Sequence, residues 1–140
     1  MRRVVVDTST LVGAALQIGS VPYRALELVL AAGQLCASAQ TLAELQQVLR
    51  CPKFDRYQPI AMRREFFDIV SAAAVVYDVS AADEAAVEPR CRDAKDDKFL
   101  ALASVCKPDV IVSSDADLLV LDPWHEVRVL KPAAYLELHS

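Results

Sequence analysis

Short apolar runs alternate with longer amphipathic segments along this chain, and the two patterns predict different elements. The run 4–6 is apolar at every position, which is typical of a strand buried on both faces of a parallel sheet. Leu42, Leu45 and Leu49 recur at helical spacing, and Pro52 marks the end of that helix. Five strands separated by helices predict an α/β fold, a three-layer α/β/α sandwich around a five-stranded, mostly parallel sheet.

The same patterns set the expected bounds of each element. Strands are expected at residues 3–6, 35–37, 74–77, 109–113 and 127–130. Helices are expected at residues 21–32 (closed by Gly33), 39–50, 59–72 and 96–106, with a short helix beginning at Ser80 or Asp83 and a closing helix from Pro132. The chain has three glycines and no repeat or low-complexity segment, so we expect one domain over residues 1–140.

Composition indicates a globular protein and bears on its environment. Hydrophobic residues make up 54% of the chain and charged residues 24%, and no apolar run is long enough to span a bilayer. Asp7 follows the basic pair Arg2 and Arg3 too closely for the apolar core of a secretory signal, so we expect a cytoplasmic protein without membrane contact. The four cysteines are 15, 40 and 15 residues apart and form no CxxC pair, which favours reduced, mostly buried thiols over a zinc site.

Carboxylates follow the predicted strands at the edge where ligands gather in parallel sheets. Asp7 comes directly after the first strand, and Asp115 comes shortly after the fourth. Asp96 and Asp97 begin one helix, and Glu44 lies one turn into another. Acids held this close repel one another unless they take up protons or a cation, and oxygen ligands suit Mg²⁺ or Mn²⁺. The pattern therefore suggests a shared metal site.

Each acid also has a purely structural explanation, which the spacing leaves open. Asp7 is placed to cap a helix, and Glu44 to lie on the solvated face of its helix. The acids within residues 93–97 suit a helix start, with neighbouring lysines balancing their charge. Asp115 and Asp117 suit a turn after a strand.

The net charge of −4 becomes informative once these acids are set aside. Seven of the 19 acidic residues lie in the segments just described: Asp7, Glu44, Asp93, Asp96, Asp97, Asp115 and Asp117. The other 12 stand against 15 lysines and arginines, a balance of +3 that permits weak binding to a nucleic-acid backbone. The basic residues Arg50, Lys53, Arg56, Arg63 and Arg64 form either a surface that guides RNA or a solvated, partner-binding face.

Five segments of the chain resemble, in order, the motifs of the PIN-domain family of ribonucleases. These segments are residues 5–14, 41–45, 91–103, 112–119 and 129–136. Together they span essentially the whole chain, and the third is similar to that of a VapC-like bacterial subgroup of toxin components. The resemblance implies a PIN-like fold and an endoribonuclease that depends on Mg²⁺ or Mn²⁺. It also implies an RNA substrate, a small antitoxin partner and a homodimer.

The resemblance assigns roles to individual residues. The family's catalytic and metal-binding acids fall on Asp7, Glu44, Asp97 and Asp115. Asp97 is preferred to Asp96 because Leu100 follows it at the family's usual offset. Supporting roles fall on Thr8, Ser9, Asp93, Asp96, Ser113 and Asp117. Ser9 departs from the asparagine that is usual in the subgroup.

Two other functions fit parts of the pattern. A phosphoacceptor receiver domain also has an acidic pocket on a five-stranded parallel sheet, and Ser113 with Lys131 and Pro132 would serve it, but Asp7 lacks an adjacent acidic partner. A catalytically silent PIN scaffold would keep the fold without turnover, although the complete acid set argues against it. Labelling with acetyl phosphate would distinguish a receiver from a nuclease.

Overall fold

Five parallel strands form the central sheet of the computed structural model, which describes residues 2–139. The strands are β1 (Arg2–Val6), β2 (Gly33–Ser38), β3 (Val75–Tyr77), β4 (Val110–Val112) and β5 (Arg128–Leu130). They lie in the order β3-β2-β1-β4-β5, and every neighbouring pair is parallel. The predicted α/β fold with a five-stranded parallel sheet is confirmed.

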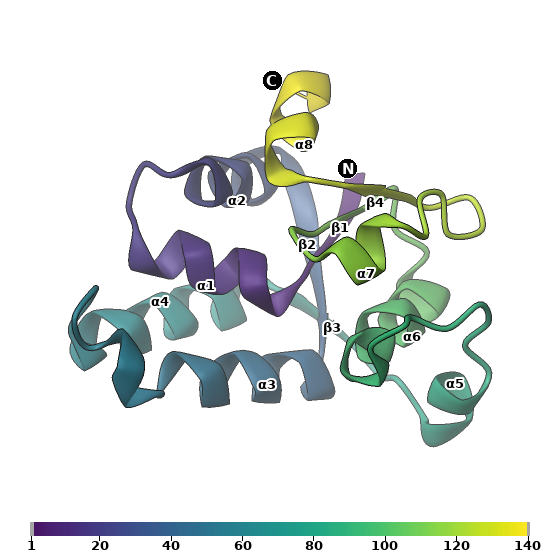
Figure 1. Ribbon diagram of the computed structural model, residues 1–140, viewed down its shortest axis with the longest axis horizontal. Coiled ribbons are helices and arrows are strands. Elements are labelled where there is room, and N and C mark those ends of the chain that lie inside the picture. The colour runs from purple at the N-terminus through teal and green to yellow at the C-terminus, as the bar shows by residue number, and fades with distance from the viewer. Residues whose placement is uncertain (1, 140) are drawn as a thin grey trace.

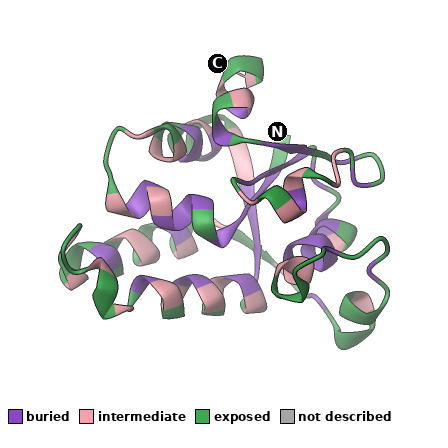
Figure 2. Ribbon diagram, viewed as in Figure 1, coloured by how far each residue is buried: buried purple, intermediate pink, exposed green. Residues whose placement is uncertain are grey.

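Helices cover both faces of this sheet (Figure 1). They are α1 (Thr8–Leu16), α2 (Val21–Ala32), α3 (Ala39–Leu49), α4 (Ile60–Ala73), α5 (Ala81–Ala85), α6 (Asp97–Cys106), α7 (Ala116–Leu119) and α8 (Pro132–His139), with 3-10 turns η1 (Pro52–Phe54) and η2 (Ala94–Asp96). Val4 and Val6 of β1 pack in a core with α1, α2, α3, α4 and α8, whereas Val5 packs in a second core with α6 and α7. Figure 2 shows how burial follows the strands and the inner sides of the helices.

Helix α1 follows β1 directly and is not predicted by the hydrophobic pattern. Asp7 is its N-cap, and the Asp7 side chain accepts a hydrogen bond from the Thr10 amide. Buried residues such as Leu11, Val12 and Ala15 occur on several sides of the helix, which contacts α2, α3 and α4. A helix enclosed in this way lacks the polar stripe by which a surface helix is found in a sequence.

Gly33 ends α2 and begins β2, because two backbone segments come very close at this position. Its φ of −131° is ordinary extended backbone, so the expected left-handed closure of the helix does not occur. A Cβ atom on residue 33 would lie 3.1 Å from the Arg2 carbonyl oxygen and 3.2 Å from the Val29 carbonyl oxygen. Any larger residue would therefore push β1 away from the end of α2.

The order of the strands places the ligand-binding edge between β1 and β4. The chain runs outward from β1 to β2 and β3, and then returns to the other side of β1 to form β4. In open parallel sheets, ligands bind outside the carboxyl ends of the strands at such a reversal. Receiver domains have the order 2-1-3-4-5 instead, so the topology does not support the receiver alternative.

Cys36, Cys91 and Cys106 are buried and Cys51 is half-buried, in line with the prediction that most thiols are buried. All four are free thiols.

Over residues 2–139, no helix combines the length and the apolar character needed to cross a membrane.

Candidate active site

The carboxyl ends of β1 and β4 bring two distant chain segments together. Val6 pairs with Val112, and the Asp7 amide donates to the Val112 carbonyl oxygen at 3.0 Å. Asp7 and Ser113 therefore follow neighbouring strands, and the Ser113 hydroxyl donates to Asp7 Oδ2 at 2.6 Å. The two residues are buried, with 2% and 0% of their surfaces exposed. The first predicted acid thus lies inside the molecule at the ligand-binding edge.

Asp7 is held in place by three hydrogen-bond donors. Besides Ser113, the Thr10 amide donates to Oδ1 at 3.0 Å and the Ser9 hydroxyl donates to Oδ2 at 3.2 Å. Burial raises the pKa of the Asp7 carboxyl, and the hydrogen bonds from Ser113, Thr10 and Ser9 offset only part of that effect. The Asp7 carboxylate is therefore held in one orientation, and the three groups that hold it are all uncharged.

Ser113 also connects Asp7 to Asp115. The Ser113 oxygen accepts from the Asp115 amide at 2.9 Å while its hydroxyl donates to Asp7. Asp115 is the N-cap of α7, and its Oδ1 accepts from the Asp117 amide at 2.8 Å. One hydroxyl group thus sets the positions of two predicted acids on different strands.

Asp96 lies closer to these acids than its neighbour Asp97 does. Its Oδ2 atom is buried and has no hydrogen-bond partner among residues 2–139. Its carboxyl group is within hydrogen-bonding reach of the Asp115 carboxyl group. Two ionised carboxylates cannot hydrogen-bond to each other, so this contact requires a shared proton or a shared cation. Burial first, and then Asp115, Asp93 and Asp7, raise the pKa of Asp96 to about 7.

Asp97 instead anchors the loop that precedes η2. Its Oδ1 accepts from the Cys91 amide at 2.8 Å, and its Oδ2 forms an ion pair with Arg90 at 3.3 Å. These contacts occupy both oxygens. The structure thus brings Asp96 beside Asp115, and it gives Asp97, the residue preferred from the sequence, partners of its own.

Glu44 lies at the border of the acid group, on α3. The Thr8 hydroxyl donates to Glu44 Oε1 at 2.5 Å, which connects the start of α1 to α3. The ammonium group of Lys98, on α6, forms an ion pair with Glu44 Oε2. Both Glu44 oxygens are thus occupied by groups of this chain.

The remaining predicted residues lie around this group. Asp93 is exposed and caps η2, where its Oδ1 accepts from the Lys95 amide at 3.0 Å. Asp117 is half-buried in the first turn of α7. Ser9 is exposed, although its hydroxyl reaches Asp7.

The fit of a divalent cation can be judged from these contacts. No group of three or more His, Cys, Asp or Glu side chains within residues 2–139 is already arranged to hold a metal ion. The donors are nevertheless the carboxylate oxygens that Mg²⁺ and Mn²⁺ prefer, and Asp96 offers a buried oxygen without a partner beside Asp115. In donor type and in charge, Asp7, Asp96 and Asp115 fit such an ion.

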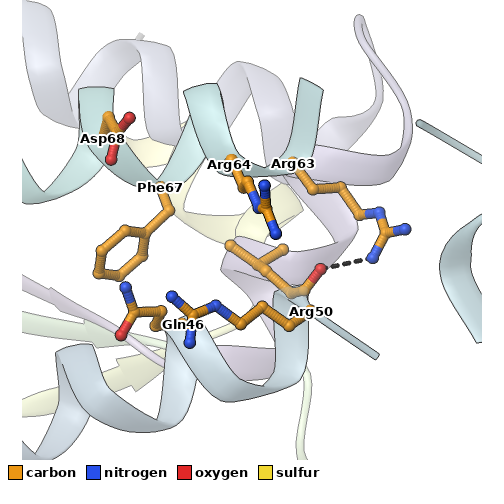
Figure 3. A pocket seen from close by; sticks show the side chains of 7 residues that line it. Gln46, Arg50, Arg63, Arg64, Phe67 and Asp68 are labelled. Atoms are coloured by element: carbon orange, nitrogen blue, oxygen red, sulfur yellow. Dashed lines mark hydrogen bonds between the residues drawn. The ribbon is translucent and has the colours of Figure 1, made fainter. Parts of the chain in front are cut away.

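The five basic residues predicted from the sequence have different surroundings: Arg63 is structural, Arg50 and Arg64 line a pocket, and Lys53 and Arg56 are exposed. Arg63 is fully buried; it donates to the carbonyl oxygens of Leu49, Cys51 and Gln58 and pairs with Asp55, so it is not available to RNA. Figure 3 shows Arg50 and Arg64 reaching from α3 and α4 toward a pocket of about 150 Å³, which Gln46 and Phe67 also line. No acidic side chain in the described part of the chain forms an ion pair with either arginine.

Comparison with known sequence families decides the family. The family described as PIN domain matches residues 3–117, which include all the acids named above. The chain belongs to the PIN-domain family. This is a family of nucleases.

This PIN domain shares its fold with two solved structures. VapBC2 from Rickettsia felis, bound to a DNA fragment from their promoter, is 15% identical with a TM-score of 0.64, over 91% of this chain and 96% of that chain. VapC20 from Mycobacterium tuberculosis, a Sarcin-Ricin loop cleaving toxin, is 18% identical with a TM-score of 0.55, over 81% and 91%. Identities this low establish a shared fold. Among curated protein sequences, the chain has no significant match.

Two ion pairs of this PIN domain were not predicted from the sequence. Lys98 pairs with Glu44, and Arg90 pairs with Asp97. Glu44 and Lys98 are 54 residues apart, so no local pattern connects them. Only the cap position of Asp7 carries a local signal, because an aspartate at a helix start accepts from the amide three residues later.

Proposed function

We propose that this PIN domain is a metal-dependent endoribonuclease that acts in the cytoplasm as the toxin of a toxin–antitoxin pair. The observation that carries the proposal is the buried carboxylate of Asp7. Ser113 connects this carboxylate to Asp115, and Asp96 lies beside Asp115. Three acids from three chain segments gather at the edge of the sheet where ligands bind. Such a group repels itself unless a cation neutralises it.

Asp7, Asp96 and Asp115 would hold Mg²⁺ or Mn²⁺. A bound metal of this kind supplies an activated water and stabilises the charge that develops on a phosphodiester. In this proposal Asp96 replaces Asp97, the residue assigned from the sequence, because Asp97 already pairs with the positive charge of Arg90, whereas Asp96 has a buried oxygen without a partner among the described residues.

The other residues of the site orient these acids. Ser113 donates to Asp7 and accepts from the Asp115 amide, so it connects the Asp7 carboxylate to the backbone of Asp115. The Thr10 amide holds the other oxygen of Asp7, Ser9 donates to the same oxygen as Ser113, and Thr8 fixes Glu44. Asp7 and Ser113 are both buried, so they form the inner wall of the site.

The choice of RNA as substrate is supported by the family resemblance and by the described activity of the VapC20 toxin. Arg50 and Arg64 offer two unpaired positive charges to a phosphate backbone. Arg50 lies six residues beyond Glu44 on α3, about 9 Å along the helix axis, which is within the span of a few nucleotides.

A small antitoxin and a second copy of this chain are the proposed protein partners. The similarity to VapBC2 supports the antitoxin. Exposed apolar side chains are present at the sheet edge and on the helix before it, where Ile69, Val75 and Val76 are 55%, 41% and 55% exposed. Exposed apolar groups of this kind are a common feature of protein interfaces.

Cleavage of single-stranded RNA tests the proposal. With Mn²⁺, the wild type and the matched control Asp78→Asn are expected to cut RNA to products with 5′-phosphate and 3′-hydroxyl ends. Asp78 is an exposed aspartate that follows the outer strand β3, two strands away from β1. EDTA should abolish cutting, and Asp7→Asn should slow it by about 100-fold or more, because it removes a few kcal/mol of transition-state stabilisation. Equal cleavage by all three proteins, with or without EDTA, would refute the proposal.

A further inference from the structure

Lys98 occupies the side of the site where Glu44 lies. Its ammonium group forms an ion pair with Glu44 Oε2, and the two side chains are 23% and 25% exposed. The other Glu44 oxygen accepts from the Thr8 hydroxyl. A metal ion that used Glu44 Oε2 as a ligand would therefore meet the positive charge of Lys98.

The acids of the edge therefore divide into two groups according to their counter-charges. Glu44 and Asp97 each have a cation of this chain, Lys98 and Arg90 respectively. Within residues 2–139, Asp7, Asp96 and Asp115 form no ion pair. Positive charge is missing on one side of the site and already present on the other.

We propose that Lys98 fills the place of a second metal ion, so that the site consists of one divalent metal on Asp7, Asp96 and Asp115 and one ammonium group on Glu44. This inference rests on the proposed metal-dependent function and specifies its charge arrangement. An ammonium is a compact point charge with three donors. While it binds Glu44, it keeps further donors for a phosphate oxygen. A second divalent ion beside it would be repelled by a like charge.

Counting bound Mn²⁺ tests this arrangement without measuring activity. Free Mn²⁺ is measured by electron paramagnetic resonance during titration of the full chain. The wild type is expected to bind one ion, and Lys98→Met two, the second more weakly, because Glu44 and Thr8 become available. Lys95→Met removes the same charge three residues away, from an exposed side chain that forms no ion pair in the described part of the chain, and is expected to bind one ion.

The Glu44→Gln variant tests the same inference from the other partner. Its Mn²⁺ affinity should stay within about tenfold of the wild type, whereas Asp96→Asn should lose at least the 10–100-fold seen when groups supporting metal ligands are removed. Circular dichroism confirms that each variant is folded before titration. Two ions on the wild type, one ion on Lys98→Met, or equal losses in Glu44→Gln and Asp96→Asn would each overturn the inference while leaving a metal-dependent nuclease in place. Failure of the wild type to bind Mn²⁺ would overturn both.

Discussion

Asp96 and Asp97 are adjacent in sequence but have different surroundings. Asp96 ends the turn η2 and Asp97 begins α6, so the chain rotates between them and points the two side chains in different directions. Asp97 is directed to the amide of Cys91 and to Arg90, whereas Asp96 is directed toward Asp115. A shift of one residue at a helix start thus decides which carboxylate can meet the other acids.

Replacing Asp96 by asparagine is expected to stabilise the metal-free protein at alkaline pH. The pKa of Asp96 is raised from 3.8 to about 7, so between these values the folded chain holds a proton that the unfolded chain releases. The free energy of unfolding of the wild type therefore falls as pH rises through this window. Asparagine does not ionise, so the variant does not lose this stability. Because Asp96 is partly exposed, we expect a gain of about 1 kcal/mol, or roughly 3–5 °C in Tm, at pH 8, and little change at pH 4.

Thermal unfolding in EDTA at the two pH values measures this effect. Asp78→Asn is the control, because Asp78 is exposed and lies away from the other acids. A Tm of Asp96→Asn at or below that of the wild type at pH 8 would show that the repulsion among Asp96, Asp115 and Asp7 is absent.

Sequence reasoning located the acids better than it located their partners. Asp7 and Asp115 follow predicted strands, and neighbouring parallel strands end at one edge, so their approach follows from the fold. Which of Asp96 and Asp97 turns inward depends on where η2 ends, and helix boundaries are set by local capping that sequence patterns place only approximately. The contact of Lys98 with Glu44 joins two helices and has no local signal.

At the scale of elements, Arg63 joins α3 to α4. This buried side chain donates to the Leu49 carbonyl at the end of α3 and to the carbonyls of Cys51 and Gln58 in the connection that follows. The last carbonyls of a helix lack partners within the helix and carry partial negative charge, so a guanidinium there meets both needs. Arg63 is thus a structural residue in a segment that sequence reasoning considered for RNA binding.

Arg63→Met is expected to lower the free energy of unfolding by about 3 kcal/mol, because it leaves three carbonyl oxygens without their donor. The neighbouring Arg64 is exposed, so Arg64→Met should change stability by no more than about 0.5 kcal/mol. Urea unfolding followed by circular dichroism measures both. Similar midpoints for the two variants would contradict the role assigned to Arg63.

The elements themselves were predictable where one periodicity dominated. The apolar run of β1 and the leucines of α3 gave a strand and a helix at the right places. Helix α1 was not predicted because several of its sides are buried, which removes the contrast between polar and apolar positions. The edge strand β3 is short, and Val75 and Val76 are exposed, so its sequence signal came from β-branched residues and not from burial.

At the scale of the whole molecule, the distribution of charge matters more than its sum. The chain carries a net charge of −4, but Asp7, Asp96 and Asp115 concentrate negative charge at one edge of the sheet. Arg50 follows the last residue of α3, whereas α3 begins directly after β2, and Arg64 of α4 lines the same pocket as Arg50. An acidic protein can thus present a cation-binding centre and a separate basic surface to one substrate strand.

A crystal structure with Mn²⁺ tests the central claim most directly. Anomalous scattering identifies the ion without reference to the protein coordinates. We predict one peak per chain in contact with the carboxylates of Asp7, Asp96 and Asp115, with Lys98 still bound to Glu44. Carboxylates that remain apart at saturating Mn²⁺, with no anomalous peak between them, would contradict the account.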